Sequence, residues 1–229
     1  MIAASAADET MPARPRCDPP RPALPCGMID AYVWTTPNGY KALLLLEELE
    51  LPYTARWVNI MKGEQHAPEF LAINPNHKIP AIVDHDTNVT VFESGAIAIY
   101  LAEKTGRLLA ASGPDRYTAL EWVFFQTGGT GPIIGQLFHF KRFAPEKLPY
   151  AIDRYRKETE RLLGVLDRRL GQVPFLAGEL SIADLMNITW ARAAGDLDVD
   201  LASFPNVTRW LTELEARPAV ARALALEAP

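Results

Sequence analysis

The chain has 229 residues, of which 48% are hydrophobic and 22% charged, and this balance is typical of a globular protein that buries its core without metals or disulfides. Its formal net charge of −5 argues against a broad nucleic-acid or anionic-membrane surface, because such surfaces need clustered Lys and Arg. The only two cysteines are Cys17 and Cys26, so a disulfide scaffold, a cysteine-based metal site and a protein-borne redox thiol are excluded for the rest of the chain.

Residues 1–27 differ in composition from everything that follows. Six of the nineteen prolines lie in this segment, and its apolar residues show neither strand nor helix periodicity, which predicts an extended or disordered tail. The segment is a poor signal peptide because it carries Asp8 and Glu9 and lacks an apolar core. Met28, directly before the first strand pattern, is an alternative start of translation, so the mature protein either includes or lacks this tail.

The first half of the remaining chain alternates strands and helices. The patterns predict a strand, a helix, a strand, a short helix, a β-hairpin and a final helix over Met28–Trp34, Tyr40–Glu50, Tyr53–Asn59, Pro68–Ile73, Ala81–Asp84 with Val89–Phe92, and Ser94–Lys104. A βαβ unit followed by a hairpin and a packing helix is typical of a small thioredoxin-like α/β domain. We therefore expect such a domain over residues 28–107.

After Gly106 only helical patterns occur, which predicts an all-helical domain over residues 114–229 behind a linker at 108–113. The expected helices are Pro114–Thr127, Tyr150–Leu170, Ile182–Ala194, Pro205–Ala216 and Pro218–Leu226. In the first of them, Tyr117, Leu120, Phe124 and Thr127 fall on one stripe. Ser181 and Asp184 have the spacing of a capping box, with Asp in place of the usual Glu.

Thr36, Pro37 and Asn38 mark the start of the first helix. A helix N-terminus presents free N–H groups and a partial positive charge, which lowers the pKa of a thiol placed there. Thr and Asn side chains can donate a hydrogen bond to sulfur but cannot form a disulfide, so any sulfur at this turn belongs to a ligand. The alternative is a helix cap without chemistry, and either Thr35 or Thr36 can be the residue that faces the sulfur.

The pair Ile79 and Pro80 lies where a turn enters a strand, which makes it a candidate cis peptide bond. Such a kink leaves the backbone N–H and C=O of Ile79 free to pair, as a strand would, with a peptide-like ligand. An ordinary trans proline at the start of a strand is the alternative interpretation.

Glu93 and Ser94 begin the last helix of the α/β half. Ser94 is expected to cap this helix and to form an anion site with its hydroxyl and the first N–H groups, while Glu93 can receive an ammonium. An ammonium beside a carboxylate is the head of an α-amino acid. The alternative is a plain helix cap with a solvated Glu.

Gln65, Lys78 and Arg154 are donors that can hold carboxylates, although each alone is typical of a solvated surface. The glycine-rich segment at 126–132 lacks the ending of a phosphate-binding loop and no strand precedes it, so we expect its glycines to bend a helix or to let two helices approach. The four histidines show no metal-ligand spacing, and no nucleophile elbow is present.

Taken together, these motifs resemble the cytosolic glutathione transferase superfamily, and most closely its Nu class of glutathione-dependent disulfide-bond oxidoreductases. The resemblance runs from Met28 to about Ala225 and rests on six segments: Thr36–Gly39, Asn76–Asp84, Phe92–Ile97, Gln126–Gln136, Pro149–Tyr155 and Ser181–Asp184. The Ile-Pro and Glu-Ser-Gly pair is specific to the superfamily, and the Thr-Pro-Asn turn and Gly-Gly-x-Gly-Pro segment are more specific to the class.

The resemblance implies a role for each candidate residue. Glu93 and Ser94 would hold the γ-glutamyl head of glutathione, and Ile79 beside cis-Pro80 would pair with its cysteinyl backbone. Lys78 and Gln65 would hold the glycine carboxylate, while Thr36 and Asn38 would face the thiol. Arg154 would contact a second glutathione, since the class holds two glutathiones, or oxidised glutathione, in one site. The segment at Ser181 would be structural.

The implied function is a cytoplasmic, homodimeric, glutathione-dependent disulfide reductase with no tightly bound cofactor and with glutathione as cosubstrate. Its partners would be glutathione, oxidised glutathione and a small-molecule disulfide, with no nucleic acid and no membrane. The alternatives are a transferase that conjugates glutathione to carbon electrophiles and a glutathione-binding regulatory protein without turnover.

Overall fold

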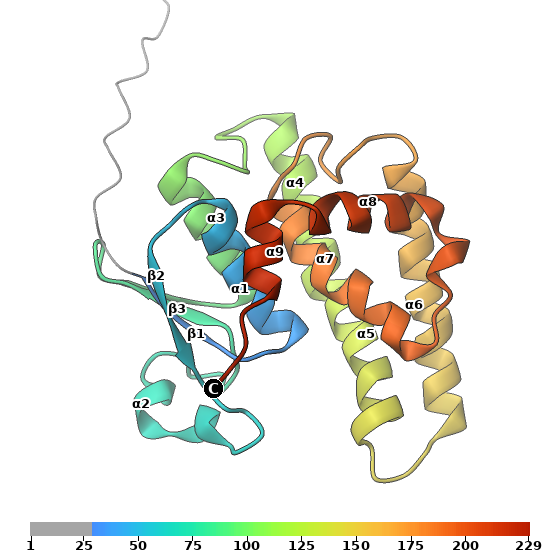
Figure 1. Ribbon diagram of the computed structural model, residues 1–229, viewed down its shortest axis with the longest axis horizontal. Helices are drawn as coiled ribbons and strands as arrows, with labels where there is room; N and C mark the ends of the chain where they lie inside the picture. Colours follow the sequence, from blue (N-terminus) through green and yellow to red (C-terminus); the bar gives the residue numbers. More distant parts are fainter. Residues whose placement is uncertain (1–28) are drawn as a thin grey trace, which may run out of the picture.

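The computed structural model describes residues 29–229, so the predicted tail and Met28 lie outside the described residues. Two parts lie side by side in Figure 1: a sheet flanked by helices, in blue and green, and a bundle of helices from yellow-green to red. No helix within residues 29–229 combines the length and the apolar character that a membrane crossing requires.

The sheet has four strands in the order β2-β1-β3-β4. Strand β1 pairs in parallel with β2 and antiparallel with β3, and β3 pairs antiparallel with β4. The bounds are Ile29–Val33 for β1, Tyr53–Trp57 for β2, Ala81–Asp84 for β3 and Val89–Phe92 for β4. This mixed sheet, with a helical crossover between its two parallel strands, confirms the predicted thioredoxin-like arrangement.

Three helices accompany the sheet: α1 (Pro37–Glu48), α2 (Pro68–Leu71) and α3 (Ser94–Thr105). Helix α1 is covered on all sides, because it packs against β1 and α3 in its own half and against α7 and α9 of the helical half. Its residues Leu43, Leu44, Leu45 and Leu46 are all fully buried. A helix that is apolar all round is stable only when it is enclosed in this way.

The helical half contains α4, α5, α6, α7, α8 and α9, which span Pro114–Phe125, Gly131–Phe138, Pro149–Leu170, Ile182–Ala194, Pro205–Glu215 and Pro218–Leu224. Two π-helical turns, η2 (Gln126–Thr130) and η3 (His139–Phe143), extend α4 and α5. The glycine-rich segment is therefore part of a continuous helix, and the phosphate-loop interpretation stays excluded. Widened turns of this kind are frequent at functional sites.

The stripe of side chains noted on the first of these helices is not the face that the helix buries. Ala119 and Val123 are the residues that α4 buries, whereas Tyr117 and Phe124 are 67% and 64% exposed. The aromatic stripe points away from this chain's own core and leaves an apolar surface on α4.

The predicted capping box is confirmed at the start of α7. The Ser181 hydroxyl accepts from the Ala183 N–H at 3.2 Å, and the Asp184 carboxylate accepts from the Ser181 N–H at 3.0 Å. Asp184 also accepts from the Leu176 N–H and the Trp210 indole N–H, each at 2.9 Å. Because the carboxylate is fully buried, these donors are what makes its burial tolerable.

Most element ends differ from the sequence prediction by a few residues. Helix α1 begins at Pro37 rather than Tyr40, since Thr36 already caps it, and it ends at Glu48. Strand β2 stops at Trp57, and α2 at Leu71. Helix α3 runs to Thr105, and Gly106 follows in the left-handed conformation that commonly ends helices.

Gly39 lets α1 begin directly against the end of β1. A Cβ at this position would lie 2.0 Å from the backbone oxygen of Trp34, and neither backbone can yield without moving the helix start. We predict that Gly39→Ala lowers the free energy of unfolding by about 2–4 kcal/mol. Gly128→Ala is the matched control, because a Cβ there meets nothing within 4 Å. Urea unfolding measures both, and equal midpoints would contradict the close-approach constraint.

Candidate active site

A cavity of about 470 Å³ lies between the two halves of the molecule. Its walls come from the start of α1, the turn before β3, the start of α3, the segment from η2 to α5, and α7. The sequence-predicted residues that line it are Asn38, Lys78, Ile79, Pro80, Glu93 and Ser94. The fold therefore brings six of the nine predicted site residues to one cavity, although they lie up to 56 positions apart in the chain.

The peptide bond between Ile79 and Pro80 is cis, as predicted. Neither backbone group of Ile79 bonds to another described residue, so both are available to an extended ligand. The buried side chain of Asn74, which is 2% exposed, stabilises this turn. Its amide donates to the Lys78 carbonyl at 2.5 Å, and its oxygen accepts from the Asn76 N–H at 2.9 Å.

The start of α3 differs from the prediction in one respect. Ser94 is the first residue of the helix rather than its cap, and Glu93 occupies the cap position with a φ of 69°, in the left-handed region. No side chain caps this helix, so its first N–H groups remain free to bind an anion. The exposed Glu93 carboxylate accepts from the Asn76 amide at 3.4 Å.

The start of α1 is capped by Thr36, whose hydroxyl oxygen accepts from the Gly39 N–H at 3.2 Å. The hydroxyl proton remains free to be donated. Thr36 is not among the residues that line the cavity, whereas Asn38 is. The structure thus places Asn38 in the cavity and Thr36 at its edge as the cap, and it gives Thr35 no comparable contact.

The Asn38 side chain is held by two donors. Its oxygen accepts from Lys41 Nζ at 3.0 Å and from the Trp190 indole N–H at 2.8 Å. Because Lys and indole N–H groups can only donate, they fix the carbonyl end of the amide, and the NH₂ end is left as a donor for a ligand. Trp190 lies on α7, so this contact also joins the two halves of the molecule.

Lys41 is 2% exposed and lines the same cavity. No carboxylate within residues 29–229 forms an ion pair with it, and burial lowers the pKa of its ammonium to about 7, against a smaller opposing effect of the Glu93 charge. Sequence reasoning missed both Lys41 and Trp190. One sequence signal for the burial of Lys41 was available. This lysine directly precedes the apolar run from Ala42 to Leu46, and a charged residue next to such a run is buried when the helix is enclosed on all sides.

Gln126 is a further polar wall of the cavity. It is fully buried in η2, and neither its amide nitrogen nor its amide oxygen has a partner among the described residues. A buried amide without partners costs free energy unless a ligand or water satisfies it. Its amide nitrogen and oxygen are therefore unpaired polar atoms in the wall of the cavity.

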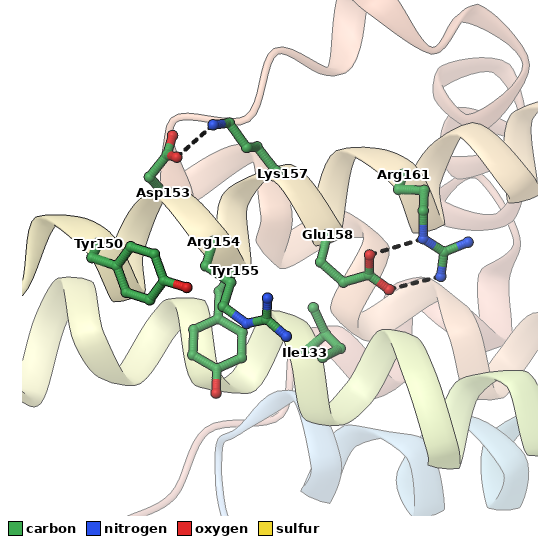
Figure 2. A pocket seen from close by; sticks show the side chains of 8 residues that line it. All are labelled: Ile133, Tyr150, Asp153, Arg154, Tyr155, Lys157, Glu158 and Arg161. Carbon is green, nitrogen blue, oxygen red and sulfur yellow. Dashed lines mark hydrogen bonds and ion pairs between the residues drawn. The ribbon is translucent and has the colours of Figure 1, made fainter.

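Gln65 and Arg154 lie outside this cavity. Gln65 is in the turn η1 (Glu64–His66), where its amide contacts His66 at 3.3 Å and its oxygen is buried without a partner. Arg154 lines a second cavity of about 470 Å³ along α6, where it points toward Ile133 of α5 beside Tyr155 (Figure 2). Within residues 29–229 its guanidinium has no ion-pair partner, whereas the neighbouring Arg161 is paired with Glu158.

Helix α5 separates the two cavities. Pro132, Gly135 and Gln136 line the first cavity, and their spacing places them on one face of the helix. Ile133, a step around the helix, lines the second. Arg154 thus lies in a different cavity from the six predicted site residues that line the first one.

Comparison with known proteins identifies the family. A family model of the glutathione S-transferase N-terminal domain matches residues 35–104, and one of the C-terminal domain matches residues 132–218. The chain is 49% identical over 203 residues to the disulfide-bond oxidoreductase YfcG of Escherichia coli K12, covering 86% of this chain and 94% of that protein. The chain belongs to the glutathione S-transferase family. The resemblance read from the motifs, and with it the prediction of an enzyme of this superfamily, is confirmed.

Solved structures of the same family share the fold. A glutathione transferase family member from Pseudomonas fluorescens, with two glutathione bound, is 44% identical with a TM-score of 0.82, covering 89% of this chain and 95% of that one. A glutathione transferase from Pseudomonas putida, with one glutathione disulfide bound per subunit, is 41% identical with a TM-score of 0.83, covering 90% and 95%.

The buried Lys41 makes stability depend on pH. Its folded pKa of about 7 lies below the ordinary lysine value of 10.5, so between these values the unfolded chain binds more protons and stability rises with pH. We predict a gain of about 3 kcal/mol from pH 7 to about 9.5, below the range in which the tyrosines ionise.

Urea unfolding at several pH values measures this dependence. Lys41→Met is expected to remove most of it and to be more stable than the wild type at neutral pH. Lys78→Met is the control, because that lysine lines the same cavity but is exposed. Equal pH slopes for the wild type and Lys41→Met would contradict the lowered pKa.

Proposed function

We propose that this member of the glutathione S-transferase family is a glutathione-dependent disulfide reductase in which all reacting sulfur comes from ligands. The observation that carries the proposal is a cavity at the N-terminus of α1 that is lined by Asn38, next to the capping Thr36, and by no thiol. No cysteine occurs from Gly27 to the end of the chain. Because reduction of a disulfide needs two electrons and no protein thiol is at hand, two glutathiones must supply them.

The cavity complements the charges of glutathione. The peptide would lie along the free backbone of Ile79, with its ammonium at Glu93 and its γ-glutamyl carboxylate at the free N–H groups of α3 and the Ser94 hydroxyl. Its glycine carboxylate would meet Lys78, assisted by Gln65 from the adjoining turn. In this orientation the cysteinyl side chain points toward the start of α1.

The thiol would ionise at the start of α1, where the helix dipole, the Asn38 amide and the Thr36 hydroxyl favour a thiolate. The thiolate attacks one sulfur of the substrate disulfide, forms a mixed disulfide and releases the other half as a thiolate. A second glutathione thiolate then attacks the glutathionyl sulfur, which yields oxidised glutathione and the second substrate thiol. Two glutathiones are oxidised and one disulfide is reduced.

Arg154 would hold a carboxylate of the second glutathione. The support for this assignment is an exposed guanidinium without an ion-pair partner on α6, next to the helix that forms a wall of the first cavity. The solved relatives with two glutathione or one glutathione disulfide bound are consistent with two tripeptides at one site.

We also propose that the protein is a cytoplasmic homodimer. The support for the dimer is an exposed aromatic surface: Tyr117 and Phe124 on α4 are 67% and 64% exposed, and Phe92 on the edge strand β4 is 38% exposed. Large apolar side chains that are this exposed are frequent at protein–protein interfaces.

Activity assays discriminate the reactions. We predict that the protein reduces a small disulfide such as 2-hydroxyethyl disulfide with glutathione much faster than it conjugates glutathione to an aromatic halide. Asn38→Ala should lower the reductase kcat about 10- to 100-fold, because a hydrogen bond to a charged group is lost, with a smaller effect on glutathione binding. Thr36→Val should act in the same direction.

Two outcomes would contradict this proposal. Dominant conjugation would favour the transferase alternative, and binding of oxidised glutathione without any turnover would favour the regulatory one. Thr35→Val tests the competing hydroxyl: a large loss in this variant together with none in Thr36→Val would move the assignment to Thr35.

Arg154 has its own test. Arg154→Gln should raise the KM for glutathione and weaken binding of oxidised glutathione about tenfold, since a charge-assisted hydrogen bond is lost. Arg156→Gln is the matched control, because Arg156 lies two positions along α6 and is already paired with Asp153 and Glu160. Equal effects of the two variants on calorimetric binding would show that the charge of α6, rather than Arg154 itself, is responsible.

A further inference from the structure

Lys41 has no role in the function described so far, yet it is the most unusual charge in the molecule. Its ammonium is 2% exposed, its one hydrogen bond is to the Asn38 oxygen at 3.0 Å, and it forms no ion pair within the described part of the chain. A buried charge without a partner costs several kcal/mol, so proteins keep one where something else supplies the opposite charge.

The charged groups around Lys41 do not supply it. From the start of α3 only Glu93 contributes a charge, and this carboxylate is exposed and makes no contact with Nζ. Lys78, the other cation lining the cavity, is exposed. The residues that α7, η2 and α5 contribute to the cavity, among them Trp190, Gln126 and Gln136, are all neutral. Two turns further along α1, Glu47 and Glu48 are already paired with Arg222 and Arg217.

The proposed binding mode leaves one ligand charge unmatched. Glutathione has two carboxylates, one ammonium and a thiol. In the proposed binding mode the glycine carboxylate meets Lys78, the γ-glutamyl carboxylate meets the start of α3, and the ammonium meets Glu93. The thiolate remains, and Lys41 is the remaining cation of the cavity. Its contact with Asn38 places it directly behind the amide that would donate to the sulfur.

We propose that Lys41 takes up the proton that leaves the glutathione thiol and, as an ammonium, balances the charge of the thiolate through Asn38. In this step the S–H bond breaks, water in the cavity carries the proton past Asn38, and an N–H bond forms at Nζ, so the net charge of the cavity does not change. Lys41 acts through Asn38 and this water, because its contact is with the Asn38 oxygen rather than with the reacting sulfur, and it is therefore a positioning residue. This inference rests on the proposed function. The pKa of about 7 fits it, since the amine is largely neutral above that pH and ready to accept a proton.

Ionisation of bound glutathione tests the proposal directly. The ultraviolet absorbance of the thiolate is titrated with pH in the complex, with S-methylglutathione as the baseline. In Lys41→Met the pKa of the bound thiol should rise by about one to two units, because a nearby opposite charge is lost. The reductase rate at neutral pH should fall about tenfold and recover as the pH is raised. Lys62→Met, at an exposed lysine outside the cavity, should match the wild type.

Binding of S-methylglutathione separates this role from a structural one. That ligand has no thiol proton, so Lys41→Met should bind it as the wild type does while ionising bound glutathione only at higher pH. If Lys41→Met binds S-methylglutathione and its bound glutathione has an unchanged thiol pKa, the inference is overturned while the proposed function stands. If the wild type binds neither ligand, the proposed function itself fails.

Proton release identifies the acceptor. Calorimetry in buffers of different ionisation enthalpy, at about pH 8, should show that the wild type forms the thiolate without releasing a proton. Lys41→Arg keeps the charge but cannot accept a proton, so it should form the thiolate and release close to one. Release of close to one proton by the wild type would overturn the transfer to Lys41.

Discussion

The hydrogen bonds at the Asn38 oxygen are the contacts on which the site depends. Trp190, 152 positions away on α7, and Lys41, one turn along α1, both donate to this one atom. They fix the direction of the amide before any ligand arrives, which lowers the cost of ordering it during the reaction. The Trp190 contact also ties the helical half to the start of α1, so the orientation of the Asn38 amide depends on how the two halves pack.

The sequence was sufficient to predict the parts of the site that depend on local backbone chemistry. The helix start at Thr36 and the capping box at Ser181 follow from a few adjacent residues, and the structure has both. The turn before β3 made Pro80 a candidate for a cis bond, the family resemblance decided between cis and trans, and the bond is cis. The prediction that Ser94 caps α3 was wrong by one residue, and the reason is again local. Glu93 adopts a left-handed backbone that moves the cap by one residue, and the sequence carries no mark of it, because such a backbone is uncommon for glutamate.

The parts that could not be predicted depend on packing between distant segments. Lys41 is buried because α7 and α9 cover α1, and Gln126 is buried because its side chain in η2 faces the interior. No local sequence pattern on its own predicts either burial. The same reasoning explains the aromatic stripe on α4. Periodicity identifies an apolar face, but it does not tell whether that face meets the chain's own core or lies on the surface.

The packing of α9 against α1 has a consequence for how the chain folds during synthesis. Tyr40 in α1 donates to the carbonyl of Leu226, three residues from the end, and Arg217 and Arg222 pair with glutamates of the same helix. Helix α1 therefore lacks part of its enclosure until α9 has been synthesised. During this interval its leucine-rich surface stays partly uncovered, and exposed apolar surface of this kind makes nascent chains prone to associate with one another.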